Sequence, residues 1–161
     1  MTKSEFKTLF HQNFDAVRNY IWYRSGDAEL ASDIAQEAFL KLWEKQDKLH
    51  HKNHKALLYK IASDLFVSHY RRSKLSLQFS IYAQAGQHVS TPEDEMHFDE
   101  LKKRYEKTLS LMPEKQRIVF LMSRMEQLKY TEIAQNLGIS QKTVEKRMTK
   151  ALIFLRKELN T

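Results

Sequence analysis

Residues 132–144 read EIAQNLGISQKTV, and this stretch decides how the second half of the chain folds. Gly138 suits the left-handed backbone of a tight turn. Ser140 is a good N-cap for the helix that follows. Ala134 is small enough to let a second helix cross closely, and Ile139 can fill the angle between the two helices. The stretch therefore predicts a helix-turn-helix motif.

The second helix of this motif is expected to run from Ser140 to about Leu159. Its spacing predicts a buried face made of Val144, Met148, Ala151, Leu152 and Leu155. The opposite face is polar and cationic, and such a face can enter the major groove of DNA with its N-terminal residues nearest the bases. We expect DNA contacts from Gln141, Lys142, Thr143, Lys146, Arg147 and Lys150. The alternative is a plain helical hairpin with a solvated charged face.

The composition of the 161 residues points to an all-α protein. Only three glycines and two prolines are present, too few for the turns of a β-sandwich or for glycine-rich phosphate loops. The chain has no cysteine, which excludes disulfides and thiol nucleophiles. We find no 18-residue apolar run and no signal-peptide core, so we expect a cytoplasmic protein. The net charge of +7 favours a polyanionic partner.

Helical periodicity divides the chain into two small domains. The first, residues 1–72, is predicted to hold helices at 4–24, 28–45 and 56–72. The second, residues 98–161, is predicted to hold helices at about 97–111, 113–126, 130–137 and 141–159. Residues 73–97 lack a sustained helical period and contain Gly86 and Pro92, so we interpret them as a flexible linker.

Both domains resemble the same protein family. Residues 111–156 resemble region 4 of the extracytoplasmic-function (ECF) sigma factors, and residues 142–152 resemble the Bacteroidetes branch most closely. Residues 26–43 resemble region 2, whose Asp-x-x-Gln-Glu-x-Phe signature begins here at Asp33. Residues 56–72 resemble the promoter-melting helix of that family. Two motifs in the right order, separated by a linker, make the resemblance more specific than either motif alone.

The resemblance implies a core-polymerase-binding site on the second helix. Asp33, Gln36 and Glu37 are spaced to form one polar patch on a helix surface. Taken by themselves these three residues favour a solvated helix face. In the family this patch binds the coiled coil of the β′ subunit. Phe39 is more compatible with a core position, although it could also serve the edge of this interface.

The resemblance also implies contacts to the −10 promoter element by residues 46–72. Cationic groups there could bind phosphates, and two tyrosines could stack on unpaired bases. The expected contacts are Lys52, Asn53, Lys55, Tyr59, Lys60, Tyr70, Arg71 and Arg72. The histidine-rich loop at 50–54 would hold a flipped base. Its alternatives are an exposed loop without a special role and, less favoured, a metal site.

The sequence departs from the family pattern at several positions. Leu57 stands where tryptophan is usual, Asp64 where asparagine is usual, and Ser68 where aspartate is usual. An anionic Asp64 would repel a nearby phosphate. In region 4, Lys129 replaces a common serine N-cap, and Glu132 is expected to support that helix start in part.

Together these features predict a sigma factor without catalytic activity, cofactor, metal or small-molecule substrate. The expected partners are RNA polymerase core, through its β′ coiled coil and β flap, promoter DNA at the −10 and −35 elements, and an anti-sigma factor. The polar face of the second helix of the helix-turn-helix motif would read the −35 element. No direct membrane insertion is expected. A stand-alone helix-turn-helix regulator is the main alternative, and a helical metal-dependent hydrolase is a remote one.

Overall fold

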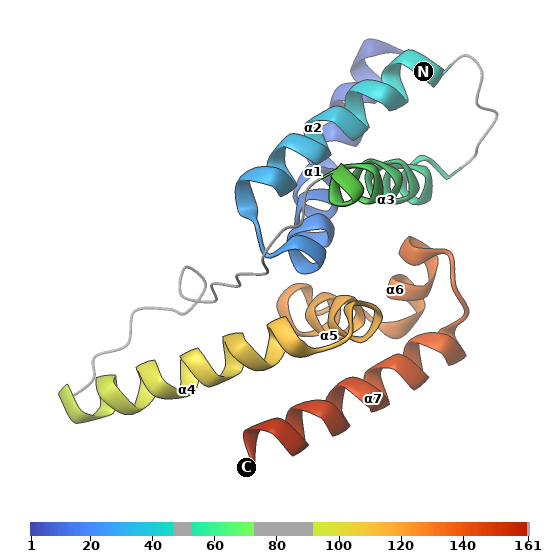
Figure 1. The fold of residues 1–161 in the computed structure, drawn as a ribbon. Coiled ribbons are helices and arrows are strands. Elements are labelled where there is room, and N and C mark those ends of the chain that lie inside the picture. Colours follow the sequence, from blue (N-terminus) through green and yellow to red (C-terminus); the bar gives the residue numbers. More distant parts are fainter. Residues whose placement is uncertain (47–52, 73–91, 161) are drawn as a thin grey trace.

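The structure is a computed structural model that describes residues 1–46, 53–72 and 92–160, and for 71–72 and 92–95 it describes the backbone. All regular elements in these ranges are helices (Figure 1). They are α1 (Lys3–Ser25), α2 (Ala28–Lys45), α3 (His54–Arg72), α4 (Pro92–Leu111), α5 (Glu114–Glu126), α6 (Tyr130–Leu137) and α7 (Gln141–Leu159). The all-α prediction is confirmed.

The first three helices pack together as one bundle. α1 and α2 form an antiparallel pair joined at Gly26, whose φ of 70° lies in the left-handed region that favours glycine. α3 packs across both of them. The apolar faces interlock through a ring cluster in which Phe39 of α2 contacts Phe6, Phe10 and Phe14 of α1. This packing fixes which face of α2 points outward.

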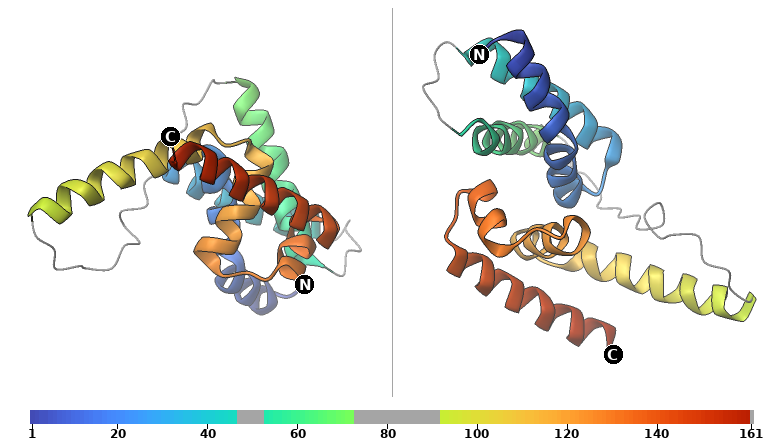
Figure 2. Two further views of the ribbon diagram at one scale, coloured as in Figure 1. Left: turned by 90° about the horizontal axis from the view of Figure 1, so that it is seen from below. Right: turned by 180° about the vertical axis from the view of Figure 1, so that it is seen from behind.

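The second half is built around α5. Helices α6 and α7 pack against it, and α4 packs along α7. The N-terminal part of α4 extends away from the rest of the molecule (Figure 2), and its Met96, Phe98 and Leu101 are exposed. Arg104 of α4 donates a hydrogen bond to the Leu159 carbonyl at 2.7 Å, which ties α4 to the end of α7.

Some observed boundaries differ from the prediction. α4 begins at Pro92, inside the stretch expected to be a linker, because proline suits the first helical position and acidic residues 93–95 suit the first turn. α3 begins at His54 rather than at 56, because Asn53 accepts a hydrogen bond from the Ala56 N–H at 3.1 Å. Pro113 precedes α5 as its N-cap residue.

The predicted buried face of α7 needs one correction. Val144, Met148, Ala151 and Leu155 are buried as expected, but Leu152 is 46% exposed. The four buried residues repeat at intervals of four, three and four, so they form a narrow stripe. Leu152 follows Ala151 directly, and one step turns a side chain by about 100° around a helix of 3.6 residues per turn.

Candidate nucleic-acid interface

The turn between α6 and α7 has the geometry of a helix-turn-helix. Gly138 ends α6 with φ 68° and ψ 34°, a conformation that favours glycine. The Ser140 hydroxyl accepts a hydrogen bond from the Thr143 N–H at 3.1 Å and so caps α7. Ile133 and Val144 are fully buried where the helices cross. At the start of α6, Glu132 accepts a hydrogen bond from the Lys129 N–H at 3.0 Å, as expected.

This turn presents the polar face of α7 to solvent. Gln141, Lys142, Lys146 and Lys150 are exposed, whereas Thr143 and Arg147 are half-buried. The Thr143 hydroxyl is 2.8 Å from the Ser140 hydroxyl, so it is engaged at the helix cap. The exposed N-terminal end of α7 therefore carries cationic and amide groups that can bind phosphates or base edges.

The outward face of α2 carries the second predicted site. Asp33, Gln36 and Glu37 are exposed on it, and Glu37 forms an ion pair with Lys41 at 4.0 Å. Phe39 is 2% exposed and lies among the phenylalanines of α1, so its side chain is not on this face. Leu40, which the sequence reasoning missed, is 57% exposed on the same face, and its spacing of seven residues from Asp33 is the signal that identifies it.

The α3 residues expected at the −10 element fall into two groups. Asn53, Lys60 and Tyr70 are exposed and Lys55 is half-buried, so these side chains can reach a ligand. Tyr59 is only 2% exposed, and its ring packs edge-on against Tyr20 at a centroid distance of 5.2 Å. Stacking of Tyr59 on a base is therefore impossible in this conformation. Lys52 and the side chains of Arg71 and Arg72 lie outside the described parts of the chain.

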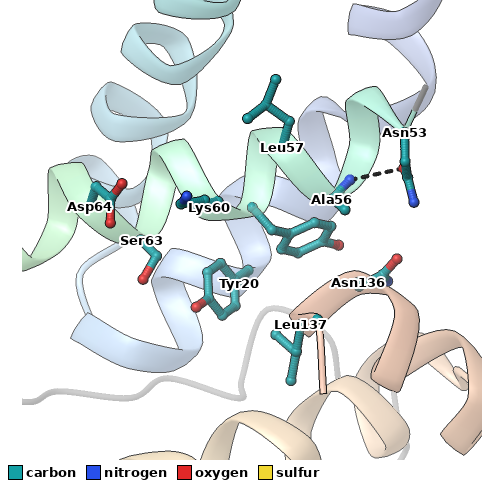
Figure 3. Close-up of a pocket in the computed structure, with 11 residues that line it drawn as sticks. Tyr20, Asn53, Ala56, Leu57, Lys60, Ser63, Asp64, Asn136 and Leu137 are labelled. Atoms are coloured by element: carbon teal, nitrogen blue, oxygen red, sulfur yellow. Dashed lines mark hydrogen bonds between the residues drawn. The ribbon is translucent and has the colours of Figure 1, made fainter. Parts of the chain in front are cut away.

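The two halves touch along α3. A pocket of about 480 Å³ lies between α3 and the end of α6. In Figure 3, Asn136 and Leu137 of α6 lie opposite α3, with Tyr20 of α1 beside them. The α3 residues that line the pocket include Leu57, Lys60 and Asp64.

The histidine-rich stretch offers no metal site in the described residues. Within those ranges, no group of three or more histidine and acidic side chains is placed to hold a metal ion. His54 is half-buried at the start of α3, while His50 and His51 lie outside the described ranges. None of the described helices is long and apolar enough to span a membrane.

Comparison with known families matches both halves of the chain. Residues 9–75 match Sigma-70 region 2, and residues 102–155 match Sigma-70 region 4. The chain belongs to the sigma-70 family and is of the ECF type. It thus functions as an RNA polymerase sigma factor, which directs promoter-specific initiation of transcription. A stand-alone helix-turn-helix regulator would not account for region 2.

Named relatives agree with this assignment. The chain is 26% identical to the RNA polymerase sigma factor YlaC of Bacillus subtilis, over 98% of this chain and 93% of that protein. It is 26% identical to the ECF sigma factor SigW of the same organism, over 90% and 83%. It is 27% identical to the ferric citrate uptake sigma factor FecI of Escherichia coli, over 91% and 86%.

A solved structure supports the fold of this sigma factor. The sigma factor RpoE of Bartonella quintana, crystallised with the anti-sigma factor NepR, superposes with a TM-score of 0.65. The two share 23% identity, and the match covers 98% of each chain. The helical layout of regions 2 and 4 is therefore shared between the two proteins.

The departures from the family pattern lie on the outer surface of α3. Asp64 and Ser68 are exposed, so neither is required by the core, whereas Leu57 is half-buried and packs against the core. Asp64 and Leu57 both line the pocket that faces α6. Asp64 and Ser68 can therefore change the exposed surface of α3 without changing the core.

Proposed function

We propose that this sigma factor binds core RNA polymerase through the outward face of α2. Asp33, Gln36, Glu37 and Leu40 form a continuous exposed strip on this helix, in which acidic and amide groups surround one apolar side chain. An exposed apolar side chain bordered by polar groups matches the apolar core and polar rim of protein interfaces. The β′ coiled coil is the proposed partner, as in the family that the chain resembles.

Promoter recognition is divided between the two halves in this proposal. The exposed end of α7, with Gln141, Lys142 and Lys146 at its centre, reads the −35 duplex in the major groove. The exposed side chains of α3 bind the −10 strand. Residues 1–72 form the domain that binds polymerase and the −10 element, and residues 73–97 form the linker. Residues 98–161 form the domain that binds the −35 element. This last domain also contacts the flap of the β subunit.

Three other features belong to this proposal. The protein acts without catalysis of its own and works in the cytoplasm. An anti-sigma factor holds it inactive, which is supported by the complex in which the Bartonella RpoE was solved. The resemblance of residues 142–152 supports membership of the Bacteroidetes branch. The exposed cationic end of α7, positioned by the turn at Gly138, is the observation that carries the DNA-binding role.

A pull-down of core polymerase tests the α2 site. Asp33→Arg combined with Glu37→Arg reverses two exposed charges at the centre of the strip, so we expect binding to be abolished. Asp15→Arg combined with Asp99→Arg is the matched control, because both positions are exposed and the change in net charge is the same. Binding by the first variant at the level of the control would show that the strip is merely solvated.

A further inference from the structure

The exposed side of α7 carries two kinds of polar group in separate rows. Residues four apart on a helix lie one above the other, about 40° apart around its axis. The first row is entirely cationic and consists of Lys142, Lys146 and Lys150, all of them exposed. The neighbouring row carries no cation and consists of Gln141, Glu145 and Thr149, which are exposed too. The two rows run side by side along the first half of α7.

The lysine row suits the phosphate backbone of DNA. An ammonium group binds a phosphate as a point charge. Much of the affinity gained in this way comes from the release of counterions, and it does not depend on the base sequence. The lysine row can therefore hold α7 on a duplex without identifying any base.

Glu145 does not fit such a backbone contact. Residues 141–150 contain four cationic residues and one acidic residue, which is Glu145. Phosphates repel a carboxylate, so Glu145 lowers the affinity wherever it faces the backbone. The major groove differs in this respect, because the amino groups of adenine and cytosine are hydrogen-bond donors there. The carboxylate therefore fits a position near a base that carries an amino group.

The Glu145 carboxylate is joined to Gln141 across one turn of α7. Gln141 Nε2 donates a hydrogen bond to Glu145 Oε1 at 3.5 Å. This distance is at the long end for such a bond, but the charge of the carboxylate favours the same amide orientation throughout this range. An ionised carboxylate accepts and cannot donate, so the amide turns its NH₂ group toward Glu145 and its carbonyl away. Glu145 thus sets the orientation of the Gln141 amide.

The backbone of Gln141 is fixed as well. Gln141 is the first residue of α7, at the end of the helix that lies nearest to the bases in helix-turn-helix complexes. The adjacent Ser140 hydroxyl accepts a hydrogen bond from the Thr143 N–H at 3.1 Å. The packing of α7 against α4, α5 and α6 leaves this end on the outer side of the second half (Figure 1). Gln141 is therefore pre-organised before DNA binds.

A glutamine amide held in this way matches adenine. Its carbonyl can accept from the adenine N6 amino group and one of its N–H groups can donate to adenine N7, while the other N–H stays on Glu145. Guanine presents acceptors at both N7 and O6. To bind guanine, the amide would have to offer N–H groups to both atoms, and Glu145 holds one of them. The pair therefore favours adenine over guanine.

We propose that Gln141 reads an adenine in the −35 element and that Glu145 is the positioning residue that makes this choice specific against guanine. This inference rests on the proposed role of α7 at the −35 element. The lysine row supplies affinity that is independent of sequence, and the Gln141–Glu145 pair supplies discrimination at one base pair. A pair that served only the stability of α7 would leave the base preference untouched.

Selection of promoter fragments by the reconstituted holoenzyme tests the reading role. Core RNA polymerase with the full chain is allowed to bind duplex fragments in which the −35 element is randomised, and the bound fragments are sequenced. With the unsubstituted chain we expect one −35 position at which adenine exceeds guanine by about tenfold. Gln141→Ala should abolish this preference and leave the preferences at the other −35 positions within about twofold.

Glu145→Gln tests the positioning role. The new amide can donate as well as accept, so the Gln141 amide is free to turn over. We expect the adenine-to-guanine ratio at the same position to fall about fivefold. The affinity averaged over the library should stay equal or rise, because a negative charge leaves the DNA-binding face. Glu100→Gln makes the same chemical change at an exposed position of α4 and should keep the ratio of the unsubstituted chain.

Glu145→Ala is a second variant with the same expected fall in the ratio, and thermal unfolding of every variant measures the stability of the fold. An unchanged ratio in both Glu145 variants would refute the positioning role, as would a loss of all −35 preferences together with a lower unfolding temperature. An adenine preference that survives in Gln141→Ala would refute the reading role. A selected −35 motif without a Gln141-dependent adenine would overturn this inference alone. Failure of the unsubstituted chain to select any −35 motif would refute the proposed function as well.

Discussion

At the scale of single residues, the polar groups between the domains are the most informative part of the structure. Arg117 is buried and is bound by carbonyls from two different helix ends. Burial lowers the pKa of its guanidinium, because the charged form is removed from water. Hydrogen bonds to a charged group contribute more to stability than neutral ones do. This residue therefore stabilises both the core of region 4 and its contact with α1.

Replacing Arg117 should cost stability. Arg117→Met keeps an apolar side chain of similar length but leaves the carbonyls of Tyr23 and Met112 without this donor. We expect the free energy of unfolding to fall by about 3 kcal/mol, measured by urea denaturation. Lys115→Met, at an exposed position of the same helix, should change it by less than about 0.5 kcal/mol. Similar losses for both variants would contradict the role of Arg117.

Glu126 should make the domain contact depend on pH. Burial raises the pKa of its carboxyl, although hydrogen bonds from Tyr23 and Asn19 of α1 and the charge of Lys55 of α3 oppose that rise. Tyr59 of α3 also faces it, and burial together with the Glu126 charge raises the pKa of that phenol. The docked state thus binds the Glu126 proton more tightly than the separated state does.

The sign of the effect follows from linkage. Docking should be strongest below the ordinary pKa of a glutamate and should weaken as pH rises toward the raised pKa of Glu126. The chain has no cysteine, so fluorophores can be attached at Gln12→Cys on α1 and Lys157→Cys on α7, both exposed positions. Energy transfer between them, followed from acidic to neutral pH, measures this docking. Glu126→Gln should remove this component of the pH dependence. An unchanged profile in that variant would assign the dependence to another group.

At the scale of elements, the helix-turn-helix was the most predictable part. The predicted turn at Gly138, the N-cap at Ser140 and the bounds of α6 were all confirmed. They were predictable because turn and capping residues act locally and can be recognised in the sequence. Burial of Tyr59 was not predictable, because it depends on the packing of α1 and α6 against α3. The exposure of Leu152 was missed because helical spacing alone does not tell how wide the buried stripe of α7 is.

The recognition role of α7 can be tested on one side chain. Arg147→Ala should weaken binding to duplex DNA that carries the −35 element and leave binding to core polymerase intact. If Arg147 contacts a phosphate, its loss should reduce the slope of log binding constant against log salt concentration by about 0.9. If it contacts a base, its loss should cost about 1–3 kcal/mol of binding free energy and relax sequence specificity. Arg156→Ala, which removes the same charge near the other end of α7, is the control. Equal affinities of the two variants for this duplex would contradict the role of Arg147 in −35 binding.

At the scale of the whole molecule, the sequence predicted two helical domains but not how they meet. The division followed from periodicity and from the composition of residues 73–97, which are local properties. The contact between the halves involves Arg117, which donates to carbonyls of α1, and Glu126, which lies near Lys55 of α3. Their positions in the sequence resemble those of ordinary helix residues. The exposure of Asp33, Gln36 and Glu37 on one face of α2 followed from their spacing, whereas exposed Leu40 beside them was overlooked, and the binding of polymerase by this strip stays a prediction.

Transcription in vitro tests the central claim most directly. Core RNA polymerase is incubated with or without the chain on a library of DNA fragments in which both promoter elements vary. The account predicts transcripts that require the chain and start downstream of two shared motifs at a fixed spacing. It also predicts that Asp33→Arg with Glu37→Arg abolishes them while Asp15→Arg with Asp99→Arg does not. Transcripts that are independent of the chain, or that share no such motifs, would contradict it.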